Sequence, residues 1–323
     1  MSDIEQIRAA ASRLSGQARR TPLLNAPLLD QIAGRQVYVK AECLQWTGSF
    51  KFRGAWSAVS ALKPQVRAKG VLAFSSGNHG QGVALAARKH GVPAWVLMPS
   101  DAPSVKIENT KAYGATVILY DRASENREAI AALLSDEQGL TLIKPYDDAM
   151  VIAGQGTIGL EIACQAAAAG ISKAQVITCC GGGGMTSGIA LALEADAPDL
   201  CVHTAEPEDF DDVARSLAAG QILRNSRLSG SICDAIVTPQ PGDLTFPILQ
   251  RLCGAGYVVT ETEVLRAMAL AFTHFRIVLE PGGAVALAAA LFRQGAGPVV
   301  LAVASGGNVD PAVFRLALDS QCI

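Results

Sequence analysis

Lys51 stands between two aromatic residues, Phe50 and Phe52, and follows the flexible pair Gly48-Ser49. A lysine held against apolar rings loses hydration, which disfavours its charged form and leaves a nucleophilic amine. Such an amine can form a Schiff base with an aldehyde cofactor. A lysine that lies along the surface with its ammonium group in water would show the same three residues. Other segments of the chain must therefore decide between the two interpretations.

Four consecutive glycines, Gly181 to Gly184, follow one predicted strand and precede a predicted helix. Each glycine costs roughly 0.5–1 kcal/mol of conformational entropy relative to alanine, so a run of four needs a reason. In this context the backbone N–H groups can close on a phosphate, and the helix N-terminus adds its positive end. No Lys-Ser or Lys-Thr pair follows, so this is not a Walker loop. The sequence favours a phosphate site over a merely flexible turn.

Two further polar loops follow predicted strands. Residues 75–79 (Ser-Ser-Gly-Asn-His) offer small donors and backbone amides that suit a carboxylate, and Ser76 could also act as an acid or base. Residues 305–308 (Ser-Gly-Gly-Asn) end another strand, where ligands bind in open α/β sheets. Each loop taken alone is equally explained as a turn, the first as the cap of the next helix.

Two other patterns have common structural explanations. Residues 206–212 (Glu-Pro-Glu-Asp-Phe-Asp-Asp) hold five carboxylates, which suit Mg²⁺ or Ca²⁺ but also suit a solvated loop. Gly154, Gly156 and Gly159 match the G-x-G-x-x-G pattern of dinucleotide-binding loops. The strand candidate before them, residues 149–153, is short, and no acidic residue lies about 20 residues further on. We expect a turn that opens a packed helix there.

The elements that must position these loops alternate along the chain. Near-continuous apolar strands alternating with helices are typical of an α/β protein with parallel sheets. The strand candidates are too many for one small domain, so two sheets are expected. The predicted strands are residues 71–74, 94–98, 115–119, 174–178 and 299–303, and the predicted helices are 82–89, 124–134 and 186–194.

The composition supports a compact enzyme. Half of the 323 residues are hydrophobic and the net charge is −2, which gives no case for disorder or for a nucleic-acid or membrane partner. No apolar run is long enough to span a bilayer. Residues 2–7 predict a capping box and a helix rather than a signal peptide. Eight cysteines without disulfide or zinc spacing favour a reducing, cytoplasmic setting.

Together these segments resemble the fold-type II pyridoxal-phosphate enzymes, most closely the serine racemase and serine/threonine dehydratase family, with the hydroxyaspartate dehydratases as a subgroup. The resemblance implies an α/β fold like that of the tryptophan synthase β-subunit, with two open, twisted, mostly parallel sheets flanked by helices. It also implies a large cofactor domain of residues 1–68 and 148–323 and a small domain of residues 69–147. The small domain would carry the loop of residues 75–79, called the carboxylate loop below. The matching segments, in order, are residues 20–23, 47–55, 75–81, 151–157, 181–185, 280–281 and 305–308.

The resemblance also implies how pyridoxal phosphate would be held. Lys51 would be the Schiff-base lysine and the general base, with Phe50 beside the cofactor. Asn78 would hydrogen-bond the phenolic oxygen, and Ser305 would meet the pyridine nitrogen. Glu280 would belong to the same site. The phosphate would lie on Gly181, Gly182, Gly183, Gly184 and the amide of Met185.

For the substrate, the resemblance implies elimination from a small β-hydroxy amino acid, serine, threonine or 3-hydroxyaspartate, to a 2-oxo acid and ammonia. Serine at position 76 resembles the racemases, in which it is the base on the opposite face of Cα, so a racemase using Lys51 and Ser76 is the alternative. Arg127 aligns with an active-site arginine of the racemases. The carboxylate would be held by Ser75, Ser76, Asn78 and His79.

A metal and a partner are implied as well. Glu206, Asp212 and the carbonyl of Phe210 match the divalent-metal site of serine racemases, which implies Mg²⁺, or else Ca²⁺ or Mn²⁺. Relatives are commonly homodimers, and no C-terminal regulatory domain is expected. Gly282-Gly283 stands where relatives often have other small residues, so the pocket wall is expected to differ there.

Overall fold

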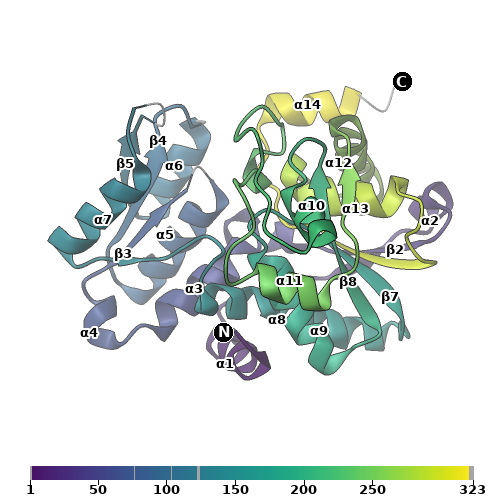
Figure 1. Cartoon of the computed structure of the whole chain (residues 1–323), viewed down its shortest axis with the longest axis horizontal. Helices are drawn as coiled ribbons and strands as arrows, with labels where there is room; N and C mark the ends of the chain where they lie inside the picture. The colour runs from purple at the N-terminus through teal and green to yellow at the C-terminus, as the bar shows by residue number, and fades with distance from the viewer. Residues whose placement is uncertain (1, 76, 103, 122–123, 320–323) are drawn as a thin grey trace.

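The computed structural model describes residues 2–75, 77–102, 104–121 and 124–319, which form two sheets covered by helices (Figure 1). The larger sheet has the strand order β1-β2-β10-β7-β8-β9. Its neighbouring strands are parallel except β1 and β2, which are antiparallel. Its strands are β1 (Leu23–Asn25), β2 (Gln36–Lys40), β7 (Ala174–Cys179), β8 (Leu200–Pro207), β9 (Tyr257–Val259) and β10 (Val299–Val303).

The smaller sheet has four parallel strands in the order β5-β4-β3-β6. All of them lie between residues 71 and 142, inside the range predicted for the small domain, and the exact division into domains stays a prediction. They are β3 (Val71–Phe74), β4 (Ala94–Pro99), β5 (Thr116–Tyr120) and β6 (Thr141–Leu142).

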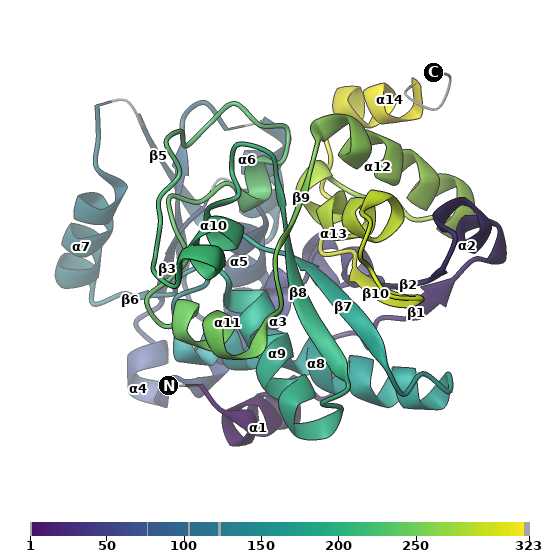
Figure 2. The same ribbon diagram turned by 45° about the vertical axis from the view of Figure 1, so that its right-hand side comes forward.

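Helices cover both sheets because their apolar faces pack on the apolar strands. In the larger sheet, the strands run between α13 on one side and α8 and α9 on the other (Figure 2). The helices are α1 (Ile4–Leu14), α2 (Pro27–Ala33), α3 (Lys51–Ala61), α4 (Pro64–Arg67), α5 (Asn78–His90), α6 (Ser104–Ala112), α7 (Arg127–Gln138), α8 (Ala149–Ala168), α9 (Gly184–Asp196), α10 (Asp212–Ala219), α11 (Phe246–Leu252), α12 (Glu261–Phe275), α13 (Pro281–Phe292) and α14 (Pro311–Asp319). The described residues also form the short 3-10 helices η1 (Glu42–Leu44), η2 (Trp46–Gly48) and η3 (Asp234–Ile236).

The predicted elements exist, with shifted ends. The strand at residues 299–303 is found as predicted, and the other predicted strands match to within a residue at their ends. Two helices begin earlier than expected, α5 at Asn78 and α9 at Gly184, because residues of the preceding loops form their first turns. The capping box predicted at the N-terminus is wrong in detail, since Asp3 caps α1 by accepting from the amide of Gln6.

The G-x-G-x-x-G segment is neither a turn nor preceded by a strand, because it lies inside the 20-residue helix α8. Its glycines let α8 approach its neighbours closely. A Cβ atom on Gly154 would lie 2.5 Å from the carbonyl oxygen of Arg53 in α3, and one on Gly156 would lie 2.9 Å from that of Gly188 in α9. The pattern therefore reflects helix packing, and the dinucleotide interpretation is excluded.

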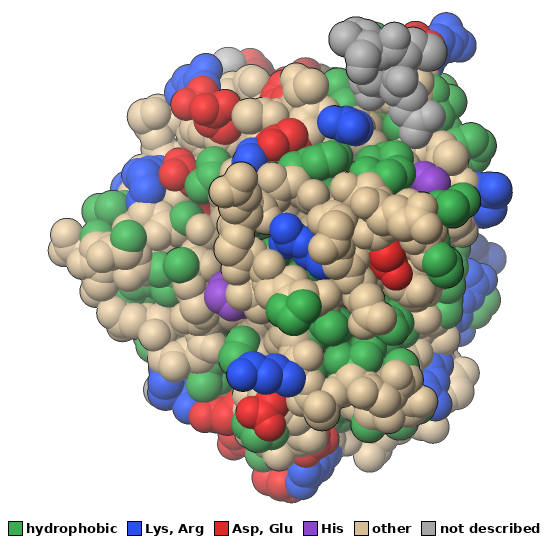
Figure 3. Space-filling view, turned by 90° about the vertical axis from the view of Figure 1, so that its right-hand side faces the viewer, with side chains coloured by type: hydrophobic (Ala, Val, Ile, Leu, Met, Phe, Trp, Pro, Cys, Tyr) green, Lys and Arg blue, Asp and Glu red, His purple; other side chains and the backbone are tan. Residues whose placement is uncertain are grey.

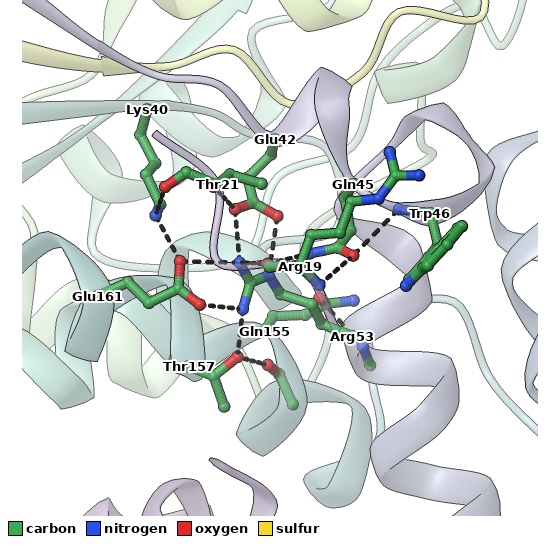
Figure 4. A network of polar contacts seen from close by, with 12 residues as sticks. Arg19, Thr21, Lys40, Glu42, Gln45, Trp46, Arg53, Gln155, Thr157 and Glu161 are labelled. Carbon is green, nitrogen blue, oxygen red and sulfur yellow. Dashed lines mark hydrogen bonds and ion pairs between the residues drawn. The ribbon is translucent and has the colours of Figure 1, made fainter. Parts of the chain in front are cut away.

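A buried cluster of charges joins the start of α3 to α8 and η1 (Figure 4). The guanidinium of Arg53 donates to Glu42 at 2.8 Å and to Glu161 at 2.7 Å. Lys40 Nζ lies 2.5 Å from Glu161, which is therefore shared between two cations. Burial alone would raise the pKa of Glu42, but Arg53 and Lys40 outweigh it and the pKa is lowered. Arg53 lies two residues after Lys51, in the first turn of α3. The cluster therefore fixes the position of the helix start, and with it the backbone of Lys51.

Two further findings bear on the expectations above. No helix among the described residues is both long enough and apolar enough to cross a bilayer. The seven cysteines that the structure describes are free thiols.

We expect Glu42→Gln to lower the free energy of unfolding by about 3 kcal/mol, because it removes one of the two carboxylates that pair with the buried Arg53. The lowered pKa of Glu42 means that its contribution is present at neutral pH and is lost as the pH falls below the ordinary carboxyl range. Urea unfolding at pH 7 measures the effect. The control is Glu194→Gln, which breaks an exposed pair with Arg251 and should cost less than about 1 kcal/mol. Equal losses in both variants would contradict the assigned role of the cluster.

Candidate functional site

A cavity of about 520 Å³ lies between the two sheets, and elements from both sides line it. The smaller sheet contributes the loop after β3 and the first turns of α5 and α7. The larger sheet contributes the loops after β7 and β10. The cavity is lined by all the residues predicted from sequence for cofactor or substrate that the structure describes: Phe50, Lys51, Ser75, Asn78, His79, Arg127, Gly181, Gly182, Gly183, Gly184, Met185, Glu280 and Ser305. Ser76 lies outside the described residues.

Lys51 is the first residue of α3, and its amine is held inside the cavity. Nζ donates to the carbonyl oxygen of Pro145 at 2.8 Å and lies 5.1 Å from the centre of the Phe50 ring. Burial lowers the pKa of Lys51 to about 8, and the nearby Cys179 and Glu280 limit the shift. Phe52, the second aromatic neighbour of Lys51, does not line the cavity as expected, because it is fully buried beside Trp56. Near neutral pH, more of this amine is therefore neutral and nucleophilic than for a lysine in water.

The glycine loop, residues 181–184, connects β7 to α9 and has no room for side chains. Gly183 has φ +91°, which favours glycine. A Cβ atom on Gly182 would lie 2.2 Å from the ring of Tyr146, and one on Gly181 would lie 2.7 Å from the carbonyl oxygen of Ile236. Thr245 Oγ1 donates to the Gly182 carbonyl at 2.6 Å, which holds that carbonyl in place. The loop therefore presents bare backbone at the N-terminus of a 13-residue helix, as a phosphate site requires.

Ser305 is poised to donate a hydrogen bond into the cavity. Burial raises the pKa of Cys179 to about 11, so its thiol stays protonated. That thiol donates to Ser305 Oγ at 3.1 Å. Since Ser305 Oγ accepts from the thiol, its own hydrogen is available for a ring nitrogen acceptor.

Asn78, Glu280 and Asn308 form a chain of hydrogen bonds at the cavity wall. Asn308 Nδ2 donates to Asn78 Oδ1 at 2.7 Å, and Asn78 Nδ2 donates to Glu280 Oε1 at 2.5 Å. Burial raises the pKa of Glu280, although Lys106 and Asn78 act in the opposite direction. The amide of Asn78 is thereby fixed in orientation toward the site.

His79 and Ser75 support the carboxylate loop from within. His79 Nε2 lies 2.8 Å from the carbonyl oxygen of Ile143, so this nitrogen carries the hydrogen. Burial lowers the pKa of His79 to about 3, and the ring is neutral. Ser75 Oγ accepts from the amide of Gly77 at 3.1 Å. Both side chains shape the loop, whose amides at the start of α5 are then free to face an anion.

Arg127 enters the cavity from α7 at its outer edge. Its Nε donates to Glu128 at 2.8 Å, and its guanidinium lies 4.9 Å from the centre of the Phe74 ring. The side chain is 44% exposed, so it faces both water and cavity.

Several lining residues were not predicted from sequence. The carbonyl of Pro145 and the ring of Tyr146 follow β6, a strand of two residues that gives almost no sequence signal. Lys106 and Asp234 both line the cavity and form an ion pair at 3.1 Å, although 128 residues separate them along the chain. No local pattern marks such pairs.

The predicted metal residues lie apart from the cavity lining, around the start of α10. Both oxygens of Glu206 accept backbone amides, from Val213 at 2.9 Å and Ala214 at 2.7 Å. Asp212 accepts from Asn225 through Oδ1, and its buried Oδ2 has no hydrogen-bond partner among the described residues. Burial raises the pKa of both Glu206 and Asp212, that of Asp212 to about 7, and the proximity of Asp212 raises that of Glu206 further. Within the described ranges, no group of three or more His, Cys, Asp or Glu side chains is arranged to hold a metal ion.

Comparison with known proteins gives relatives over nearly the full chain. L-threo-3-hydroxyaspartate ammonia-lyase of Pseudomonas sp is 42% identical, covering 96% of this chain and 96% of that protein. Serine racemase of Arabidopsis thaliana is 38% identical, covering 96% and 94%.

Solved structures agree with the two-sheet fold. The T.th. threonine deaminase has a TM-score of 0.90 at 44% identity, covering 95% of this chain and 99% of that one. Maize serine racemase has a TM-score of 0.91 at 36% identity, covering 99% and 98%. The predicted fold class is confirmed by these matches and by the two mainly parallel sheets. Since the model of the family described as "Pyridoxal-phosphate dependent enzyme" matches residues 14–306, the chain belongs to that family.

Proposed function

We propose that the protein is a pyridoxal-phosphate-dependent dehydratase that converts a small β-hydroxy amino acid to a 2-oxo acid and ammonia. The observation that carries this proposal is the amine of Lys51, which has a lowered pKa and shares one cavity with the glycine loop. The relatives named ammonia-lyase, from Pseudomonas sp, Saccharomyces cerevisiae and Thermotoga maritima, support elimination.

The residues present fit the cofactor. Lys51 would hold its aldehyde end, the glycine loop with the Met185 amide its phosphate, and Ser305 its ring nitrogen. Asn78 would face the phenolic oxygen, with Phe50 and Glu280 completing the site. When bound, pyridoxal phosphate supplies an electron sink that makes the Cα–H bond of an amino acid acidic.

The chain's own groups would bind the substrate and move its protons. The amides at the start of α5, with Ser75 and Asn78, would bind the α-carboxylate at the positive end of the helix. Lys51 Nζ, whose pKa is lowered by burial, would take the Cα proton in its neutral form. The carbonyl of Pro145 orients that amine by accepting its hydrogen bond. Enclosure between the two sheets would keep water from the reacting atoms.

Serine, threonine and 3-hydroxyaspartate are the proposed substrates, because each carries a hydroxyl on Cβ. The relative from Pseudomonas sp is named for the last of these. A distal carboxylate needs a cation nearby, and Arg127, which lines the cavity and aligns with an active-site arginine of the racemases, is one candidate.

A racemase is the second candidate, since serine racemases of Arabidopsis thaliana and of Oryza sativa are 38% and 37% identical to this chain. It would use Lys51 on one face of Cα and Ser76 on the other. Assays in D₂O separate the two functions, because a racemase gives deuterated substrate of inverted configuration, whereas a dehydratase gives oxo acid and ammonia.

We expect Lys51→Ala to reduce ammonia release from L-serine, L-threonine and the 3-hydroxyaspartate isomers by at least about 1,000-fold, because it removes the base. The measurement is ammonia release by the loaded enzyme on this panel. Lys173→Ala, which alters an exposed lysine before β7, is the control and should leave the rates unchanged. Full activity of Lys51→Ala on any of the three substrates would exclude the proposed mechanism.

Gly182→Ala should weaken binding of pyridoxal phosphate about 10- to 100-fold, because the added methyl overlaps the Tyr146 ring and displaces the glycine loop. Absorbance titration of the cofactor-free protein measures the affinity. The matched control is Gly297→Ala, whose methyl would meet no atom within 4 Å. Equal affinities for the two variants would argue against phosphate binding at this loop.

A divalent cation belongs to the proposal as well, with Mg²⁺ before Ca²⁺ or Mn²⁺. Glu206, Asp212 and the carbonyl of Phe210 would bind it. Both carboxylates are buried and have raised pKa values, and one oxygen of Asp212 lacks a partner among the described residues. Such a pair suits a hard cation that replaces the proton.

In the metal-free protein, the raised pKa of Asp212 means that stability falls as the pH rises from the ordinary carboxyl pKa to about 7. We therefore expect saturating Mg²⁺ to raise the thermal midpoint by about 5 °C at pH 8 and by less at pH 6, where the proton competes. Asp212→Asn should abolish the rise. Asp209→Asn, at an exposed carboxylate paired with Arg227, should keep it. A Mg²⁺ effect that survives Asp212→Asn would place the cation elsewhere.

A cytoplasmic homodimer completes the proposal. The face that carries α2, α12 and α14 shows hydrophobic side chains among charged ones (Figure 3). Its exposed large apolar residues are Leu28, Ile32, Phe272, Val278 and Leu316, which supports contact with a second copy.

A further inference from the structure

Lys106, on α6, reaches across the cavity to the side of the larger sheet. Its Nζ lies 3.1 Å from Oδ2 of Asp234 on η3. The Lys106 side chain is 11% exposed, whereas that of Asp234 is 54% exposed. The site therefore encloses the cation, while the anionic partner faces water.

The ammonium of Lys106 lies beside the loop proposed to bind the substrate. A Cβ atom built on Gly77 would be 3.6 Å from Lys106 Nζ, and Gly77 directly precedes the first residue of α5. The charge of Lys106 also acts on Glu280, which lines the same cavity. A bound amino acid would thus lie within direct reach of this cation.

Serine and threonine bring one carboxylate, which the start of α5 can bind. A 3-hydroxyaspartate brings a second carboxylate, which would be desolvated without compensation unless a cation meets it. Arg127 is half-exposed and already paired with Glu128. Lys106 is more enclosed, and its pair with the exposed Asp234 is weakened by water.

We propose that Lys106 binds the distal carboxylate of a dicarboxylic β-hydroxy amino acid, with that carboxylate taking the place of Asp234. The proposal rests on the dehydratase function above and names its substrate class, 3-hydroxyaspartate in preference to serine or threonine. One carboxylate exchanges for another at the same ammonium, and Asp234 returns to water. The ammonium of Lys106 then has one carboxylate partner both before and after binding.

The test uses the holoenzyme and the variants Lys106→Gln, Asp234→Asn and Lys111→Gln. Lys111 is an exposed lysine on the same helix and serves as the matched control. Calorimetry measures binding of succinate, with butyrate as the monocarboxylate of equal length. Steady-state assays give kcat/KM for L-threo-3-hydroxyaspartate and L-serine.

Lys106→Gln should weaken succinate binding and lower kcat/KM for 3-hydroxyaspartate by about 10- to 100-fold, as expected for loss of a charged hydrogen bond. Butyrate binding and kcat/KM for L-serine should change by less than about threefold. Asp234→Asn should strengthen succinate binding, because it removes the competing carboxylate. Lys111→Gln should match the unaltered protein in every measurement.

Unchanged succinate affinity in Lys106→Gln would overturn the inference. The inference would also be overturned if Lys106→Gln and Asp234→Asn each lowered kcat/KM equally for 3-hydroxyaspartate and for L-serine. That result would mean that the ion pair only holds the two sides of the cavity together. If the enzyme eliminates water from serine but neither binds succinate nor turns over 3-hydroxyaspartate, the role proposed for Lys106 is overturned and the dehydratase function stands. Absence of ammonia release from every hydroxy amino acid would overturn the proposed function, whereas succinate binding that depends on Lys106 would still support the cation site.

Discussion

Arg53 lies two residues after Lys51 in the first turn of α3, and two buried carboxylates hold its guanidinium. Glu42 precedes α3 in the chain, and Glu161 lies more than a hundred residues later in α8. The start of α3 cannot shift along its axis or rotate without separating charges inside the protein, which is costly. The position of Lys51 is therefore defined by buried charges at the start of α3. Lys40 shares Glu161, so the cluster also attaches this helix to the last residue of β2.

The remaining groups reach the cavity because parallel strands end at the same edge of a sheet. β7 delivers the glycine loop and β10 delivers Ser305 side by side, since the two strands are hydrogen-bonded neighbours. β3 delivers the carboxylate loop from the smaller sheet. The two sheets differ in what they present to the cavity. The larger sheet presents bare backbone and the hydroxyl of Ser305, and the smaller one presents the start of α5 and the cationic side chains of Lys106 and Arg127. A flat cofactor between them would meet its substrate from the second side.

Much of this was readable from the sequence, for physical reasons. Buried parallel strands are apolar throughout, so β3, β7 and β10 were visible, and a run of four glycines between strand and helix has few explanations. The role of the glycines in α8 could not be predicted from the sequence, because glycine is required both in a turn and at a close contact between helices. Phe52 was misjudged since neighbouring residues on a helix point in different directions. The contacts of Lys51 with Pro145 and of Lys106 with Asp234 depend on how the two sheets face each other, and no local pattern specifies that.

The five residues 143–147 do more than connect β6 to α8. The carbonyl of Ile143 holds His79, the carbonyl of Pro145 holds Lys51, and the ring of Tyr146 covers Gly182. This stretch is also where the chain returns from the smaller sheet to the larger one. A rotation of one sheet against the other must twist the same short linker that aims the amine, seats the imidazole and covers the glycine loop. A movement of the two sheets and a change in the direction of the Lys51 amine are therefore coupled through one short segment.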